Sequence, residues 1–176
     1  MIDIDYKFVA SILGYIVTAI SLVTLQLPKK WQILICQGVG NLLCGIGTIM
    51  QIGINSASAI CFLAVLQCGI NLKHSIYDEH ISNVEKILFT IAYLVCGFLG
   101  FRSLLDLMPI VGAILFMCCV FCKKEQHMRF FSLANAISFL VYYAVIGSTM
   151  VFAQVVGLAS ILIALYRYRT KRTEGR

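Results

Sequence analysis

The stretch that decides the fold is residues 29–53, KKWQILICQGVGNLLCGIGTIMQIG, in which two lysines open a long run without charge. Residues 123–147, KKEQHMRFFSLANAISFLVYYAVIG, repeat this plan at a constant offset of 94 positions. Both stretches begin with Lys-Lys, carry an asparagine twelve positions later (Asn41 and Asn135) and close with Ile-Gly. The matches fall on polar and glycine positions rather than on interchangeable aliphatic ones. This favours an internal duplication over chance similarity between two membrane hairpins.

The composition is that of an integral membrane protein. Of the 176 residues, 60% are hydrophobic and 12% are charged, whereas soluble domains are about 45 to 50% apolar. The net charge is +6, but the bases lie in loops and at the C-terminus. We therefore expect them to face the lipid bilayer surface and expect no nucleic-acid partner. Residues 1–7 hold two acids and one base rather than the basic start of a signal peptide, so we expect the first span to be retained.

Uncharged runs predict seven membrane-spanning helices, at about 20 residues for each crossing. The run at residues 31–72 is long enough for two spans and contains one turn-like cluster, Gly-Ile-Asn-Ser at 53–56. A second long run is broken in the same way by Gly-Ser-Thr at 147–149. In chain order, the predicted spans lie within residues 8–28, 31–72 (two spans), 82–101, 107–122 and 130–166 (two spans).

Charge asymmetry orients these spans. Seven spans place the termini on opposite sides, and with the N-terminus outside, twelve of the 14 lysines and arginines become cytoplasmic, while Lys7 and Arg102 lie outside. The offset of 94 residues crosses four helices, so both copies point the same way. We therefore predict an all-α membrane protein of seven transmembrane helices in a 3-1-3 arrangement of two parallel repeats, N-out and C-in. This single membrane domain, 1–176, comprises a first repeat (8–72), a linker helix (82–101), a second repeat (107–168) and a basic cytoplasmic tail (169–176).

Polar side chains inside the spans are the candidate binding residues, because an amide in hydrocarbon needs a partner or a water-lined cavity. Gln37, Asn41, Cys44 and Thr48 follow helical spacing and share one face of the second span. The positions 94 residues later are Phe131, Asn135, Ser138 and Tyr142. Two such stripes meeting at the repeat axis would hold a neutral polar substrate near mid-membrane. The candidate substrate-binding residues are Gln37, Asn41, Thr48, Asn135, Ser138 and Tyr142.

Other interpretations of the polar residues stay open. The two asparagines would also serve as hydrogen bonds between helices, worth about 0.6 to 2 kcal/mol each. A second rank of polar residues lies nearer turns or interfaces: Gln51, Asn55, Gln67, Asn71, Thr149 and Gln154.

Chemistry beyond binding is not indicated. Apart from Glu85 and Lys86 at the start of the predicted span 82–101, the predicted spans hold no Asp, Glu, Lys, Arg or His, which favours downhill transport over proton coupling, and no catalytic motif is present. We expect no enzyme, metal or cofactor; an enzyme would have to use His74, Asp78, Glu79 and His80 in the third loop. The eight cysteines lie in or beside apolar runs, where cysteine is a small apolar filler. The C-x-x-C at 119–122 lacks the βαβ context of a redox motif and the second pair of a zinc site.

Three segments support a family resemblance: Lys29-Lys30 followed by Gln37 to Asn41, the segment DLMPIVG at 106–112, and the ending ALYR at 164–167. With these features the chain resembles the YgjV-like family of small bacterial inner-membrane proteins. More distantly, its 3-1-3 plan is similar to the SWEET and PQ-loop (MtN3-type) transporters, which facilitate movement of sugars or other small metabolites. The resemblance implies a multi-pass protein of the bacterial inner membrane.

The chain also departs from the SWEET and PQ-loop pattern. The Pro-Gln pair of the PQ-loop group is absent, and Pro28 and Pro109 are the only prolines, so the gating prolines of SWEETs are missing. Topology therefore carries over and binding residues do not. Together the residues and the resemblance predict facilitative transport of a small neutral polar metabolite such as a sugar, with a homo-oligomer compatible with the sequence. The alternative is a membrane scaffold or receptor that does not transport, and the axis between the repeats would then be packed shut.

Overall fold

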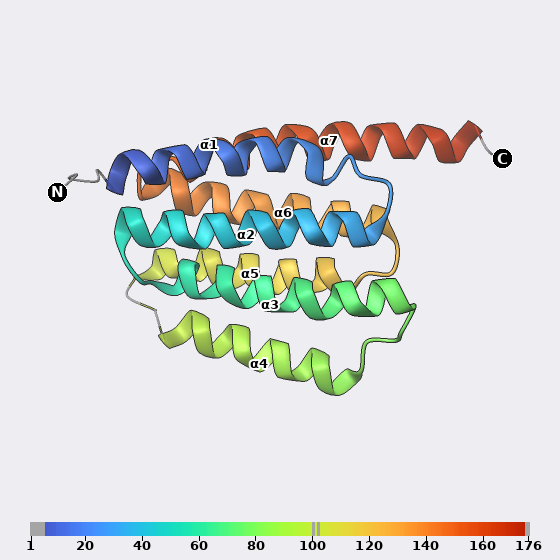
Figure 1. Cartoon of the computed structure of the whole chain (residues 1–176), viewed down its shortest axis with the longest axis horizontal. Helices are drawn as coiled ribbons and strands as arrows, with labels where there is room; N and C mark the ends of the chain where they lie inside the picture. The colour runs from blue at the N-terminus through green and yellow to red at the C-terminus, as the bar shows by residue number, and fades with distance from the viewer. Residues whose placement is uncertain (1–5, 100, 102, 175–176) are drawn as a thin grey trace.

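The computed structural model describes residues 6–99, 101 and 103–174, and over these residues every regular secondary-structure element is a helix (Figure 1). Arg102 and residues 175–176 of the predicted tail lie outside the described part, as do the side chains of Lys7 and of residues 168–174. The described helices are α1 (Tyr6–Thr24), α2 (Lys30–Ile52), α3 (Ser56–Tyr77), α4 (Asn83–Leu99), the short 3-10 helix η1 (Leu104–Asp106), α5 (Leu107–Phe121), α6 (Glu125–Val145) and α7 (Met150–Glu174).

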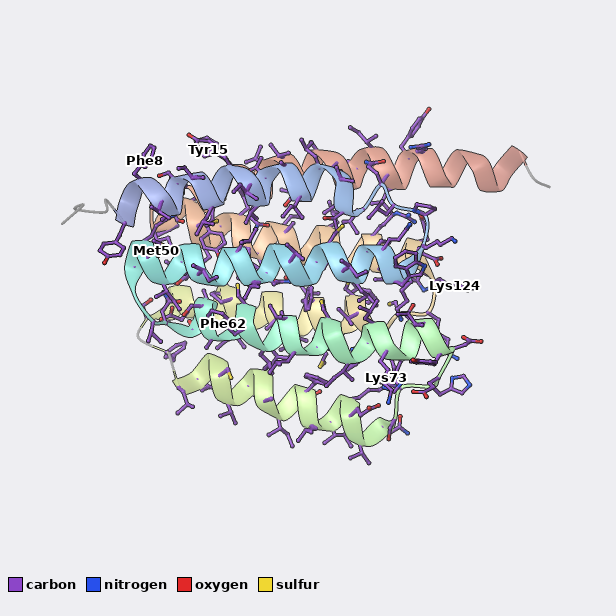
Figure 2. The ribbon with its side chains drawn as sticks, viewed as in Figure 1. Phe8, Tyr15, Met50, Phe62, Lys73 and Lys124 are labelled. Carbon is purple, nitrogen blue, oxygen red and sulfur yellow. The ribbon has the colours of Figure 1, made fainter. Side chains whose placement is uncertain are left out.

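Within the described part of the chain, five helical segments are long and apolar enough to cross a membrane: α2, α3, η1 with α5, α6, and the part of α7 up to Arg167. The apolar part of α1, Phe8–Thr24, and the 17-residue α4 are shorter. Large apolar side chains cover the outside of the bundle; Leu66 on α3 and Leu88 on α4 are each 64% exposed. Phe8 and Tyr15 likewise point away from the bundle (Figure 2). So much exposed apolar surface is expected in lipid and not in water.

Six of the helices form a closed ring. Helix α1 packs against α2 and α7, α2 against α3, α3 against α5, α5 against α6, and α6 against α7. Helix α4 lies outside this ring and packs against α3 and α5, at the edge of the bundle (Figure 1). Successive helices run in opposite directions, and the two termini lie at opposite ends (Figure 1). A buried site would therefore lie on the bundle axis, in the interior of the ring.

Both predicted hairpin turns are present. Gly53 ends α2 with a φ of 79°, a left-handed conformation that favours glycine, and Gly147 follows α6 with a φ of 67°. Asn55 then begins α3 with a capping box: its side chain accepts the Ser58 N–H, and the Ser58 hydroxyl accepts the Asn55 N–H, each at 3.0 Å. Local turn chemistry therefore explains where these spans end.

Arg129 departs from the sequence prediction. We expected a base in the cytoplasmic loop, but α6 begins at Glu125, and Arg129 lies inside the helix with only 2% of its surface exposed. Its guanidinium donates hydrogen bonds to the backbone carbonyls of Leu25 (3.0 Å) and Leu27 (3.1 Å), just after α1. Burial is tolerated because the cation supplies donors that these carbonyls otherwise lack at the end of a helix.

The opposite end of the bundle has its own polar link. Gln51, near the end of α2, donates to the Thr149 hydroxyl (2.8 Å) and accepts from the Ser148 hydroxyl (2.6 Å). Both partners belong to the turn between α6 and α7. The two links hold α2 and α6 to neighbouring segments at the two ends of the bundle. Neither link uses the polar side chains in the middle of the ring, which are left for another role.

Candidate functional site

A cavity of about 130 Å³ lies inside the ring, between α1, α2, α5, α6 and α7. Its polar lining consists of Ser21, Thr24, Cys36, Gln37, Asn41, Cys44, Ser132, Asn135 and Gln154. The rest of the wall is apolar, including Val17, Ile20, Phe116 and Ile161. A few convergent polar groups in an apolar wall are typical of small-molecule sites.

A second cavity of about 60 Å³ adjoins the first. It extends between α2, α3, α5 and α6 and is lined by Ile60, Cys61, Phe139 and Tyr143, among others. Five residues line both cavities: Asn41, Cys44, Phe116, Asn135 and Gln154. The two hollows are therefore neighbours that share one wall.

Asn41 and Gln37 are placed by helix α2 on the cavity side. The Asn41 amide donates to the Gln37 backbone carbonyl at 2.8 Å, one turn earlier. The Gln37 amide nitrogen lies 3.9 Å from the Cys119 sulfur on α5, a long contact. The Gln37 side-chain oxygen is buried and has no hydrogen-bond partner among the described residues. A buried unpaired acceptor of this kind costs about 1 to 3 kcal/mol.

Asn135 reaches the same cavities from α6. Its side-chain oxygen is buried, without a partner among the described residues, and lies beside Gly112 on α5. A Cβ atom at Gly112 would lie 3.2 Å from this oxygen and 2.6 Å from the Phe139 ring, so glycine is needed for the close approach of α5 and α6. The two asparagines thus line one hollow, and polar atoms on both sides of it lack full hydrogen bonding.

The other predicted site residues lie elsewhere. Thr48 is buried at 3.4 Å from the Tyr143 hydroxyl, which also lies 3.3 Å from the Cys44 sulfur. Ser138 donates to the Ala134 carbonyl of its own helix at 3.3 Å. Tyr142 is buried with its ring 5.4 Å from the ring of Tyr143. The structure therefore brings Gln37, Asn41 and Asn135 to the cavity, and places Thr48, Ser138 and Tyr142 beyond its lining.

Sequence reasoning ranked Gln154 second and did not single out Phe116 or Tyr143, yet all three line the cavities. Gln154 carried a usable signal, since it is an amide within the apolar part of α7. The aromatic residues carried none, because their types are common throughout the spans. Of the other second-rank amides, Gln67 accepts a hydrogen bond from the Tyr93 hydroxyl at 2.7 Å, linking α3 to α4 outside the cavities.

The third loop, between α3 and α4, lies beside a charged hollow of about 510 Å³ at the lysine-rich end. His74 contacts Glu79 at 3.2 Å and Glu85 at 3.0 Å, and His80 lies 3.3 Å from the Lys123 amine. The Ser82 backbone N–H, and next the His74 ring, lower the pKa of Glu85 below its ordinary value. Among the described residues, no group of three or more His, Cys, Asp or Glu side chains is placed to hold a metal ion. All eight cysteines are free thiols.

Comparison with known proteins gives one result. The model of the Imp-YgjV family, described as a bacterial inner membrane protein, matches residues 8–172. Neither the curated proteins nor the solved structures include a significant match. The matched segment contains every span discussed above and covers nearly the whole chain. The protein therefore belongs to the Imp-YgjV family of bacterial inner membrane proteins.

Proposed function

We propose that this protein is a facilitative transporter, similar to the SWEET carriers, for a small neutral polar metabolite such as a sugar. The substrate binds in the central cavity between Asn41 and Asn135, and moves down its own gradient. The single observation that carries the proposal is a partly polar hollow on the ring axis, lined by both asparagines. A scaffold would instead be expected to pack this axis shut.

The helix contacts support two parallel repeats in a 3-1-3 arrangement. If α1, α2 and α3 correspond to α5, α6 and α7, every contact in the ring has a counterpart. The pairs α1–α2 and α5–α6 correspond, as do α2–α3 and α6–α7, and α3–α5 corresponds to α7–α1. Asn41 and Asn135, 94 positions apart, then occupy equivalent places on either side of a twofold axis. Repeat-built transporters bind substrate at such interfaces.

The distribution of bases supports the N-out orientation. The lysine pairs that begin α2 and precede α6, together with Lys73 and Lys86, lie toward one end of the bundle. Lys73 and Lys124 are seen at that end, opposite Phe8 (Figure 2). The positive-inside rule assigns this end to the cytoplasm.

The lining suggests a neutral substrate. Among the described residues that line the two cavities there is no Asp, Glu, Lys, Arg or His. A charged substrate would lose its hydration without gaining a counter-charge, at a cost of several kcal/mol. Amides, hydroxyls and aromatic rings instead suit the hydroxyl groups and apolar faces of a polyol or sugar.

A thermal-shift screen tests this function. Detergent-purified protein is heated with erythritol, xylitol, glucose, urea and neutral amides, at tens of millimolar. A ligand at about ten to one hundred times its Kd adds roughly 1.4 to 2.7 kcal/mol to the stability of the folded protein. We expect a shift in the wild type that is lost in the N41A/N135A double variant.

Asn71→Ala is the matched control. Asn71 is also buried, and its amide also donates to the backbone carbonyl one turn earlier, at 2.9 Å, but it lines neither cavity. Its variant should keep the ligand shift. No shift across the panel from folded wild-type protein, or a shift that survives in the double variant, would favour the scaffold or receptor alternative.

A further inference from the structure

We propose that Phe116 is the gate between two chambers of one path through the protein. This inference rests on the proposed transport function, since it assigns the central cavity and its smaller neighbour to a single route. The gate separates a larger chamber that extends toward the lysine-rich end from a smaller chamber nearer the opposite end.

The positions of the lining residues establish the direction of the path. The larger cavity extends to Thr24 and Leu25 at the end of α1 and to Cys36 in the second turn of α2, all toward the lysine-rich end. The smaller cavity extends to Ile60 in the second turn of α3 and Tyr143 near the end of α6, toward the opposite end. The two hollows therefore follow one another along the bundle axis.

The five residues that line both chambers form the wall between them. Of its five residues, Asn41 is bonded to the carbonyl of Gln37, and Cys44 lies in contact with the Tyr143 hydroxyl. Phe116 is the large apolar member of the wall, on α5, and 7% of its surface is exposed. No polar contact fixes a phenyl ring, so a change of its rotamer joins the chambers without breaking a hydrogen bond.

The chamber sizes bound the substrate. A cavity of about 150 Å³ engineered into another protein takes one benzene molecule. The larger chamber, at about 130 Å³, is slightly smaller and therefore suits a ligand of about six non-hydrogen atoms, such as a small polyol. The smaller chamber, at about 60 Å³, admits such a ligand only when the Phe116 ring withdraws. Disaccharides are too large for either.

Native cysteines report on the two chambers. Cys36 lines the larger chamber and Cys61 lines the smaller one, while the buried Cys68 lines neither. Sealed inner-membrane vesicles that expose the lysine-rich end are treated with a small, neutral methanethiosulfonate, which forms a mixed disulfide and releases methanesulfinate. Mass spectrometry then gives the rate of modification at each cysteine of the otherwise unaltered protein.

The expected result is a selective change at Cys61. In the wild type, Cys36 reacts and Cys61 reacts at least tenfold more slowly. Phe116→Ala brings the Cys61 rate close to the Cys36 rate, and Phe116→Leu gives an intermediate rate. Phe89→Ala is the matched control: Phe89 is also 7% exposed, but it packs against Phe121 between α4 and α5, outside the chambers. It should leave the Cys61 rate unchanged.

Two results would overturn the gate. One is an unchanged Cys61 rate in both Phe116 variants while Cys68 stays protected, which establishes that the variants are folded. The other is an equal increase of the Cys61 rate in the Phe89 variant, which would indicate that both substitutions loosen the helix bundle in general. Labelling needs no substrate, so the gate is tested separately from the proposed function. A thermal-shift screen in which no compound binds would contradict transport, but it would not change the labelling result.

Discussion

Asn41 and Asn135 line the same two cavities from α2 and α6, although 94 positions separate them in the sequence. Among the described residues, neither side-chain amide forms a hydrogen bond that connects the two helices. Asn41 donates to its own helix, and the Asn135 oxygen has no partner among the described residues. Helices that needed these side chains for association would pair them directly.

Replacing Asn135 separates binding from stability. Asn135→Ala removes a buried unpaired acceptor that costs about 1 to 3 kcal/mol, which offsets the packing lost with the amide. We therefore expect the free energy of unfolding to change by less than about 1 kcal/mol, together with loss of the ligand shift. Thermal unfolding in detergent measures the first quantity. A loss above about 2 kcal/mol would instead indicate that the side chain holds helices together.

Arg129 is expected to matter for folding. Arg129→Ala leaves the Leu25 and Leu27 carbonyls without these donors, and each lost partner of a buried group costs about 1 to 3 kcal/mol. We predict a loss of about 2 to 5 kcal/mol, less for Arg129→Lys. Lys124→Ala, at an exposed base nearby, is the control and should be nearly neutral. Equal unfolding temperatures for the Arg129 and Lys124 variants would refute the assignment.

Gly97 fixes the distance between α4 and α5. A Cβ atom there would lie 2.6 Å from the Ile110 side chain, so Gly97→Ala should lower stability by about 1 to 3 kcal/mol through overpacking. Gly69, on α3, has open space at its Cβ position. Gly69→Ala should therefore be neutral or raise stability by up to about 1 kcal/mol through helix propensity. Chemical or thermal unfolding of the two variants distinguishes them, and a similar effect of both would contradict the packing account.

Glu85 predicts a pH dependence. Its pKa is lowered in the folded protein by the Ser82 N–H and by His74, so the folded state favours the carboxylate more than the unfolded state does. The resulting stability is fully present above the ordinary pKa of about 4.3 and is lost as pH falls through the lowered value. Glu85→Gln should therefore lower the unfolding temperature at pH 7 and have a progressively smaller effect as the pH falls below about 4.3. A difference that persists at low pH would exclude this cause.

Local features of the sequence predicted much of the fold. The charge-free runs predicted the helices in the correct order, and the clusters at Gly53 and Gly147 predicted the hairpin turns. Both predictions succeeded because they depend on residues that are close together in the sequence. Family membership and the inner-membrane assignment are confirmed by the match over residues 8–172. The predicted repeats, orientation and transport remain proposals.

Distant contacts decided what the sequence left undetermined. Arg129 looked like a loop base because its acceptors lie more than 100 residues away, after α1. Thr48 shares a face with the cavity residues of α2 but lies one turn beyond Cys44, past the end of the lining, whereas Ser138 and Tyr142 lie beside the lining face of α6. Phe116 and Gln154 reach the cavity only because α5 and α7 close the ring.

Solute entry into proteoliposomes tests the central claim most directly. Vesicles containing the purified protein are shrunk by a hyperosmotic step of erythritol, xylitol, glucose or sucrose, and their reswelling is followed by light scattering. We predict faster reswelling for at least one of the first three solutes than in vesicles carrying the N41A/N135A variant, with the Asn71→Ala protein behaving as wild type and no entry of sucrose. Identical reswelling of wild-type and double-variant vesicles in all four solutes would contradict a substrate path between the two asparagines.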